Sequence, residues 1–134
     1  MAGALQIDQL TQVVTVLIAG CGILTLLVSY GWNRMRENGA EFVALLLLIA
    51  AGLDLIAASN SFVTLFVALE LFSLSLYVLC AFDGKSKASL ESGFKYLVLG
   101  TIGSMVLVYG AAFLYGATGS FGFEAINTAL SKAG

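Results

Sequence analysis

The stretch that decides the fold is residues 61–82, Ser61-Phe-Val-Thr-Leu-Phe-Val-Ala-Leu-Glu-Leu-Phe-Ser-Leu-Ser-Leu-Tyr-Val-Leu-Cys-Ala-Phe82. Its single charged residue is Glu70, and it is long enough to cross a bilayer, which takes about 20 apolar residues. A charge at the centre of a spanning helix costs roughly 2.5–3.5 kcal/mol on insertion scales. The stretch therefore predicts a membrane helix whose carboxyl group has a partner or binds a proton.

The composition places the whole chain in the same class. Its 134 residues are 60% hydrophobic and 10% charged, whereas a soluble domain is about 25% charged. The chain has no histidine, which excludes a His-ligated haem and the common zinc sites, and it has no basic patch for nucleic acid. We therefore expect an all-α integral membrane protein with no catalytic residues, no cofactor or metal of its own, and no nucleic-acid partner.

Hydropathy predicts four transmembrane helices within a single membrane segment, residues 1–134. Asn60, flanked by Ser59 and Ser61, is the only break between the second and third spans, so these two helices should be antiparallel neighbours. The first ten residues contain no Lys or Arg, so no cleaved signal peptide is expected. The predicted spans are residues 11–32, 42–59, 61–82 and 91–116, with connectors at 33–41 and 83–90 and a short tail at 117–134.

The basic residues are divided unequally between the two ends of these helices. Arg34, Arg36, Lys85 and Lys87 lie in the two connectors, whereas the opposite side holds Lys132. The positive-inside rule therefore predicts that both connectors are cytoplasmic and that both termini lie on the opposite side. The expected location is the cell inner (plasma) membrane, crossed several times.

Glu70 shares a face of its helix with Ser73 and Tyr77, which follow it by three and seven residues. We expect their hydroxyls to form a polar stripe that binds the carboxyl or holds water beside it; the alternative is that they only pack there. Three roles stay open for Glu70: a structural ion pair, an acid kept neutral by burial, and a site that takes up and releases protons. The last is favoured, because acids inside membranes commonly mark proton or ion paths.

Two more charged residues fall inside the predicted spans. Lys95 lies ~8–9 Å from the cytoplasmic end of its helix and Glu70 ~18 Å from the same side, so a link through water is expected rather than a direct contact. Asp54 and Glu70 differ in depth by ~5–6 Å. Either these two carboxyls face each other, or Asp54 faces a polar neighbour or water elsewhere, and its role stays open.

Gly93, Gly100, Ser104 and Ala111 form a line of small residues along the fourth span, spaced seven, four and seven residues apart. Such a line lets a second helix approach closely. Lys95 lies on the other side of this helix, and a lysine that faces lipid is disfavoured. Both sides of the fourth span should therefore meet protein, which indicates that the chain forms part of a larger helical bundle.

Four pieces of the sequence resemble a known family: EFVALLLLI at 41–49, ASNSFVTLFVALELFSLSLYVL at 58–79, ESGFKYLVLG at 91–100 and YGAAFLYGATG at 109–119. In this order they are similar to the N subunit of bacterial NADH:quinone oxidoreductase, respiratory complex I. The membrane subunits of cation/proton antiporters share parts of the pattern.

This resemblance implies that Glu70 and Lys95 take part in proton translocation. It also implies that the four spans correspond to helices three to six of an antiporter-like bundle. The implied partners are the other membrane-arm subunits of complex I, together with lipid, protons and water. Asp54 departs from the pattern, since an apolar residue is expected there. Family members are several times longer, so we expect the chain to be an internal fragment or the product of a split gene.

The predicted function is that of a proton-translocating fragment of a membrane-arm subunit, in which buried Glu and Lys couple quinone reduction to proton pumping. The chain carries no redox chemistry of its own, so that work would be done elsewhere in the complex. One alternative is a subunit of a multisubunit cation/proton antiporter. Others are a small four-helix proton-coupled exporter and a membrane scaffold with no role in transport.

Overall fold

The computed structural model describes residues 3–31 and 33–133, which form five helices and no strand. The four long helices are α1 (Gln9–Ser29), α2 (Asn33–Ala58), α3 (Phe62–Cys80) and α4 (Lys87–Thr118), and a short helix α5 (Phe123–Ala133) follows. All four long helices are long and apolar enough to cross a membrane. The predicted all-α membrane fold with four spans is confirmed.

Polar side chains mark where three of these helices begin. Asp8 caps α1, Ser61 caps α3 and Ser86 caps α4, and each accepts a hydrogen bond from the backbone N–H three residues later. Such caps satisfy donors that have no partner inside the helix. At the other end of α4, Gly119 takes the left-handed conformation with φ 71°, which a glycine adopts without steric cost.

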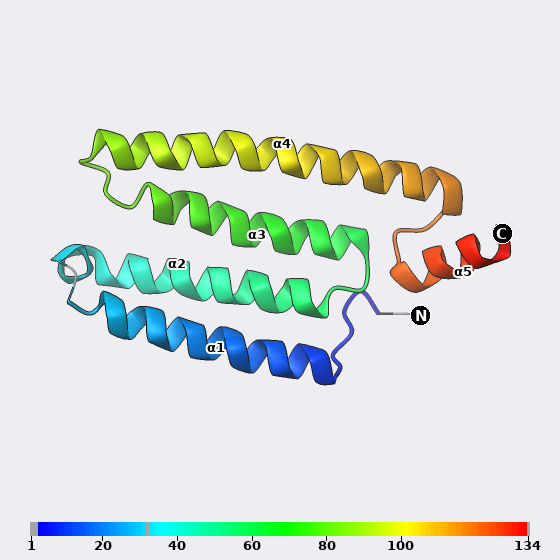
Figure 1. Cartoon of the computed structure of the whole chain (residues 1–134), viewed down its shortest axis with the longest axis horizontal. Coiled ribbons are helices and arrows are strands. Elements are labelled where there is room, and N and C mark those ends of the chain that lie inside the picture. Colours follow the sequence, from blue (N-terminus) through cyan, green and yellow to red (C-terminus); the bar gives the residue numbers. More distant parts are fainter. Residues whose placement is uncertain (1–2, 32, 134) are drawn as a thin grey trace.

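The helices lie side by side in one layer, in the order α1, α2, α3, α4 (Figure 1). Each helix runs antiparallel to the next; for α2 and α3 the three-residue turn between them requires it. The N-terminal segment, the α2–α3 turn and α5 therefore lie at one end of the layer, and the α1–α2 and α3–α4 connections lie at the other (Figure 1). This arrangement places both predicted basic connectors at the same end.

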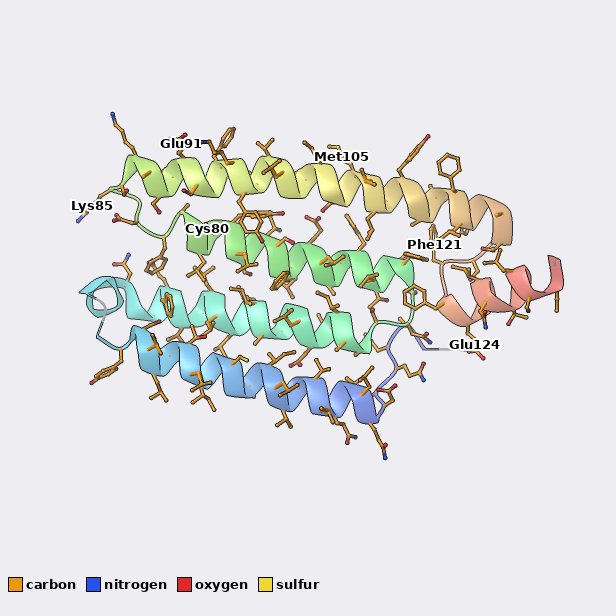
Figure 2. All side chains as sticks on the ribbon, viewed as in Figure 1. Cys80, Lys85, Glu91, Met105, Phe121 and Glu124 are labelled. Atoms are coloured by element: carbon orange, nitrogen blue, oxygen red, sulfur yellow. The ribbon has the colours of Figure 1, made fainter. Side chains whose placement is uncertain are left out.

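One layer of helices leaves a thin core. The buried apolar residues include Phe42, Ala68 and Tyr77, whereas Val28 is 85% exposed. In each candidate span, at most 17% of the apolar window is buried within this segment. Figure 2 shows apolar side chains projecting from both outer helices away from the layer. These faces need lipid or further protein to cover them.

Three segments that are distant in sequence meet at the turn end of the layer. Residues 58–60 exchange two backbone hydrogen bonds with residues 4–6, and residues 60–62 exchange two with residues 121–123, at 2.8–3.2 Å. Phe62 and Phe123 also pack edge to face, with ring centroids 5.0 Å apart. This junction fixes the ends of α2, α3 and α4 relative to one another.

The structure differs from the sequence prediction at both connectors. The sequence predicts polar connectors at 33–41 and 83–90, but α2 begins at Asn33 and continues through the first, and α4 begins at Lys87, inside the second. Helix α2 is interrupted at Asn38, whose φ of −129° and ψ of 38° are not helical. The part of α2 that qualifies as a span begins at this interruption and covers Asn38–Ala58. The side chains of Arg34 and Arg36 lie outside the described residues.

Candidate functional site

Glu70 lies near the middle of α3 and is directed toward α4. The hydroxyl of Ser104 on α4 donates a hydrogen bond to its Oε1 at 2.5 Å. The two residues are 34 positions apart in sequence, so the contact depends on how α3 and α4 pack. Among the described residues, Ser104 is the one hydrogen-bond partner of the Glu70 side chain.

The line of small residues on α4 is what brings the two helices close enough for this bond. Gly93 packs against Ala81 and the Tyr77 carbonyl, and a Cβ built on Gly100 would overlap the Tyr77 hydroxyl. Ser104 follows in the same line. The predicted role of this line, close approach by a neighbouring helix, is therefore filled by α3.

The predicted polar stripe of Ser73 and Tyr77 does not bind Glu70 in the described structure. Tyr77 is buried, with its hydroxyl against Gly100, and its ring packs edge to face on Tyr96 at 4.9 Å. Ser73 is half-buried on α3. Ser104, which the sequence indicated only as a packing residue, supplies the hydroxyl instead. A hydroxyl on the small-residue line was the signal that could have identified it.

Glu70 also lines an open groove between α3 and α4. This groove has a volume of about 460 Å³ and is bounded by eight residues: Phe66, Glu70, Thr101, Ser104, Met105, Val108, Tyr109 and Ala112. A second, apolar hollow of about 270 Å³ shares three of these residues and extends toward Phe121. The carboxyl is therefore reachable from one side of the helix layer.

Lys95 is not near Glu70 within this segment. It lies nine residues before Ser104 on α4, which places it ~13–14 Å along the axis and about half a turn around it. Its Nζ pairs with Glu91 Oε1 at 2.6 Å, and the two side chains are 69% and 63% exposed. Figure 2 shows Glu91 on the outer side of α4, away from α3. A link between Lys95 and Glu70 stays a prediction.

Asp54 and Glu70 lie at the same level but on opposite sides of the α2–α3 pair. A Cβ built on Gly52 would lie 2.8 Å from the backbone N of Phe72, so these two positions face each other. Asp54 lies two residues nearer the α2–α3 turn than Gly52, and Glu70 lies two residues nearer it than Phe72. Two residues correspond to a rotation of about 200° around a helix, so each carboxyl points away from the facing pair. Of the two arrangements left open by the sequence, the structure has the carboxyls turned away from each other.

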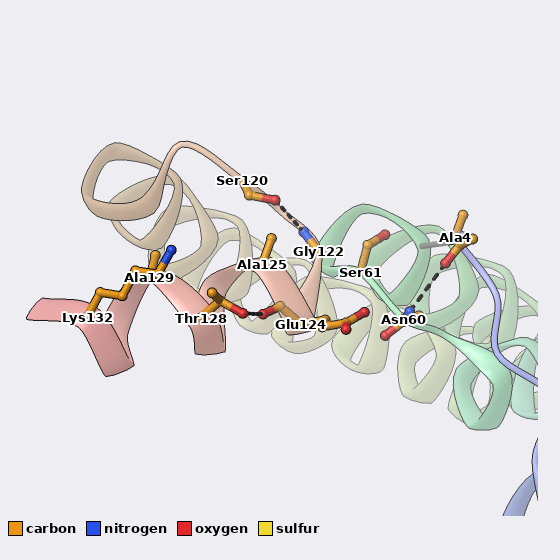
Figure 3. Close-up of a pocket in the computed structure, with 11 residues that line it drawn as sticks. Ala4, Asn60, Ser61, Ser120, Gly122, Glu124, Ala125, Thr128, Ala129 and Lys132 are labelled. Carbon is orange, nitrogen blue, oxygen red and sulfur yellow. Dashed lines mark hydrogen bonds between the residues drawn. The ribbon is translucent and has the colours of Figure 1, made fainter. Parts of the chain in front are cut away.

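A larger hollow of about 810 Å³ lies at the turn end of the layer, beside α5 (Figure 3). Its hydroxyl groups are used locally: Ser120 accepts a hydrogen bond from the Gly122 N–H at 3.1 Å, and Thr128 donates to the Glu124 carbonyl at 2.9 Å. It shares no lining residue with the groove at Glu70. The hollow is therefore separate from the groove at Glu70.

The sequence matches the NADH:quinone oxidoreductase/Mrp antiporter transmembrane family over residues 59–134. The chain belongs to this family. The matched residues are more than half of the chain and include Glu70, Lys95 and Ser104. Membership agrees with the layer of apolar helices and identifies the chain as part of an antiporter-like membrane protein.

Curated relatives agree with this assignment. The chain is 46% identical over 119 residues to NADH-quinone oxidoreductase subunit N of Myxococcus xanthus, which covers 88% of the chain and 23% of the relative. It is 44% identical over 128 residues to subunit N of Deinococcus radiodurans, an alignment that covers 93% of the chain and 25% of the relative. It is 37% identical over 127 residues to subunit N 1 of Symbiobacterium thermophilum, covering 95% and 26%. The predicted resemblance to the N subunit is confirmed, and the chain spans about a quarter of the length of these relatives.

Proposed function

We propose that the chain is a segment of the proton-translocating membrane arm of an NADH:quinone oxidoreductase, and that Glu70 takes up and releases the translocated proton. The observation that carries this proposal is the position of Glu70: the middle of an apolar span, hydrogen-bonded to Ser104 and bordering an open groove. Ionisable groups inside membrane spans are rare and mark proton and ion paths.

Two features of the geometry support a role for Glu70 as a proton carrier, and a third element, a mobile cation, would come from another segment. Ser104 holds the carboxyl toward α4, so its direction is fixed. The groove lets water or a charged side chain from another segment approach it from one side. A cation that approaches favours the carboxylate, and a cation that withdraws favours the acid. Movement of such a cation would therefore load and release the proton.

Lys95 enters the proposal as a second and separate charge. It faces the outer side of α4, where a neighbouring segment or subunit would have to cover it. It is paired with Glu91 in this segment, so a change in that pair would alter the distribution of charge on the outer side of α4. We place the two basic connectors in the cytoplasm and the α2–α3 turn on the other side of the membrane, because of the charge asymmetry.

The proposed partners are the other membrane-arm subunits of the oxidoreductase, and the energy would come from redox reactions in those and further subunits. The family name covers antiporters as well, so a cation/proton antiporter subunit is the second candidate. The curated relatives described above are named as subunits of NADH-quinone oxidoreductase, which favours the first.

The test is the Glu70→Gln variant, made in the organism that produces the chain. Inverted membrane vesicles are supplied with NADH, and proton uptake is measured per NADH oxidised. We expect Glu70→Gln to lose most of this uptake, while Glu124→Gln, which alters an exposed acid on α5, retains it. Immunoblots of the subunit confirm equal assembly. Wild-type proton uptake by an assembled Glu70→Gln complex would refute the proposal and leave the scaffold role.

A further inference from the structure

Asp54 carries a buried oxygen that the described structure leaves without a partner. It lies in α2, within the span Asn38–Ala58. Its Oδ1 is buried and accepts no hydrogen bond from the described residues. Buried polar atoms in proteins almost always have partners, so an exception inside a membrane span needs a physical explanation.

The packing places this carboxyl on the α1 side of the layer. Gly52 faces α3, and Asp54 is turned away from it by about 200°. Ala57 is three residues after Asp54 and shares its face. The carbonyl of Ala57 meets the Thr11 hydroxyl of α1 at 3.3 Å. Asp54 therefore belongs to the contact between α1 and α2, whereas Glu70 belongs to the contact between α3 and α4.

No cation among the described side chains can reach Asp54. Helix α1 contains no Asp, Glu, Lys or Arg, and the sequence between Arg36 and Lys85 contains no Lys or Arg. Arg36 precedes Asp54 by 18 residues, which is ~27 Å along a helix. The other acids of α2 from Asn38 onward and of α3 are Glu41, near the far end of α2, and Glu70, across the helix pair. An ionised Asp54 would thus be an uncompensated charge in a membrane span.

We infer that Asp54 is a second proton-binding site of this protein, a carboxylic acid held between α1 and α2 and separate from Glu70. Binding a proton removes the charge, which is the costly part of burying a carboxyl group in an apolar environment. It also gives the group one O–H donor in place of an acceptor-only carboxylate. The inference does not depend on the role of Glu70.

Infrared spectroscopy tests it, because a protonated carboxyl has a C=O stretching band that a carboxylate lacks. The protein is purified from its native membranes with its accompanying subunits, and spectra of wild type and Asp54→Asn are subtracted at neutral pH. We expect a protonated-carboxyl band that is lost in Asp54→Asn and shifts in heavy water. Asp8→Asn, which removes an exposed carboxylate at the start of α1, should not remove it. A difference spectrum that contains only carboxylate bands would overturn the inference.

A second variant separates a proton from an unseen cation supplied by another segment. Asp54→Leu replaces a neutral acid with an apolar group of similar size, so its abundance in the membrane should equal or exceed that of wild type. If Asp54 were ionised and paired with a cation, the same change would strand that cation, and a several-fold fall in abundance would contradict the inference. Proton uptake by Glu70→Gln reports on the proposed function independently, so each proposal can fail alone.

Discussion

Replacing Ser104 with Ala removes the hydroxyl that binds Glu70 and changes little else, because Ser104 lies on the small-residue line of α4. A hydrogen bond to a charged group contributes about 1.5–3 kcal/mol, and one between neutral groups about 0.5–1.5 kcal/mol. For the bond between Ser104 and Glu70 we take about 1–1.5 kcal/mol, which lies between these two cases. A bond of this size corresponds to about a five- to thirteen-fold change in the fraction of carboxyl groups that are held toward α4.

We expect the Ser104→Ala variant to pump protons about five- to thirteen-fold more slowly, because fewer Glu70 carboxyl groups would be held toward α4. The assay is NADH-driven proton uptake by inverted vesicles, normalised to the amount of subunit. The infrared band of the Glu70 carboxyl should also move to higher wavenumber, since its carbonyl oxygen loses a donor. Ser104→Cys, which keeps a weak donor on a somewhat larger side chain, should recover part of both properties.

Thr101→Val is the matched control for this experiment. Thr101 lines the same groove, but its hydroxyl donates to the Leu97 carbonyl at 2.8 Å. Its loss should leave the Glu70 band in place and proton uptake near that of wild type. A Ser104→Ala variant that pumps at the wild-type rate with an unmoved band would refute the role given to Ser104, as would an equal loss in Thr101→Val.

Two further predictions concern packing and helix capping. Gly52→Ala should lower the free energy of unfolding of the purified protein by about 1–3 kcal/mol, because the added Cβ would lie 2.8–2.9 Å from the Phe72 backbone. A Cβ added at Gly110 would have no atom within 4 Å, so Gly110→Ala should raise the free energy of unfolding by about 0.4–1 kcal/mol. Destabilisation by both substitutions would contradict the close packing at Gly52. Hydrogen bonds from the backbone and then the side chain of Thr11 hold the pKa of Asp8 below its ordinary value of 3.8. A carboxyl group whose pKa is lowered by folding stabilises the folded state at pH values above its unfolded pKa, and this stabilisation is lost as the pH falls through its folded pKa. The backbone amide of Thr11 should therefore stay protected from hydrogen exchange down to a pH below 3.8. Loss of this protection at a higher pH would contradict the assigned cap.

The sequence predicted the helices better than it predicted their mutual rotation. Length, hydropathy and the short polar turn at Ser59–Ser61 were enough to identify four antiparallel spans, since these signals lie within each element. The partner of Glu70 depends on the rotation of α4 against α3, which a connector of several residues leaves free. The pair formed by Glu91 and Lys95 is different, because its spacing of four residues on one helix is a local signal that the sequence alone carries.

Glu70, Lys95 and Asp54 lie in three separate places, and this bears on the proposed path of the proton. Glu70 lies between α3 and α4, Lys95 lies on the outer face of α4, and Asp54 lies between α1 and α2. Each pair is separated by the thickness of at least one helix, about 10 Å, which exceeds the reach of a hydrogen bond. A proton therefore cannot pass among them through direct contacts within this layer. The groove beside Glu70 opens outward instead, so any path through Glu70 must be completed by water or by side chains of neighbouring segments, and variants of Glu70 and Ser104 have to be measured in the assembled protein.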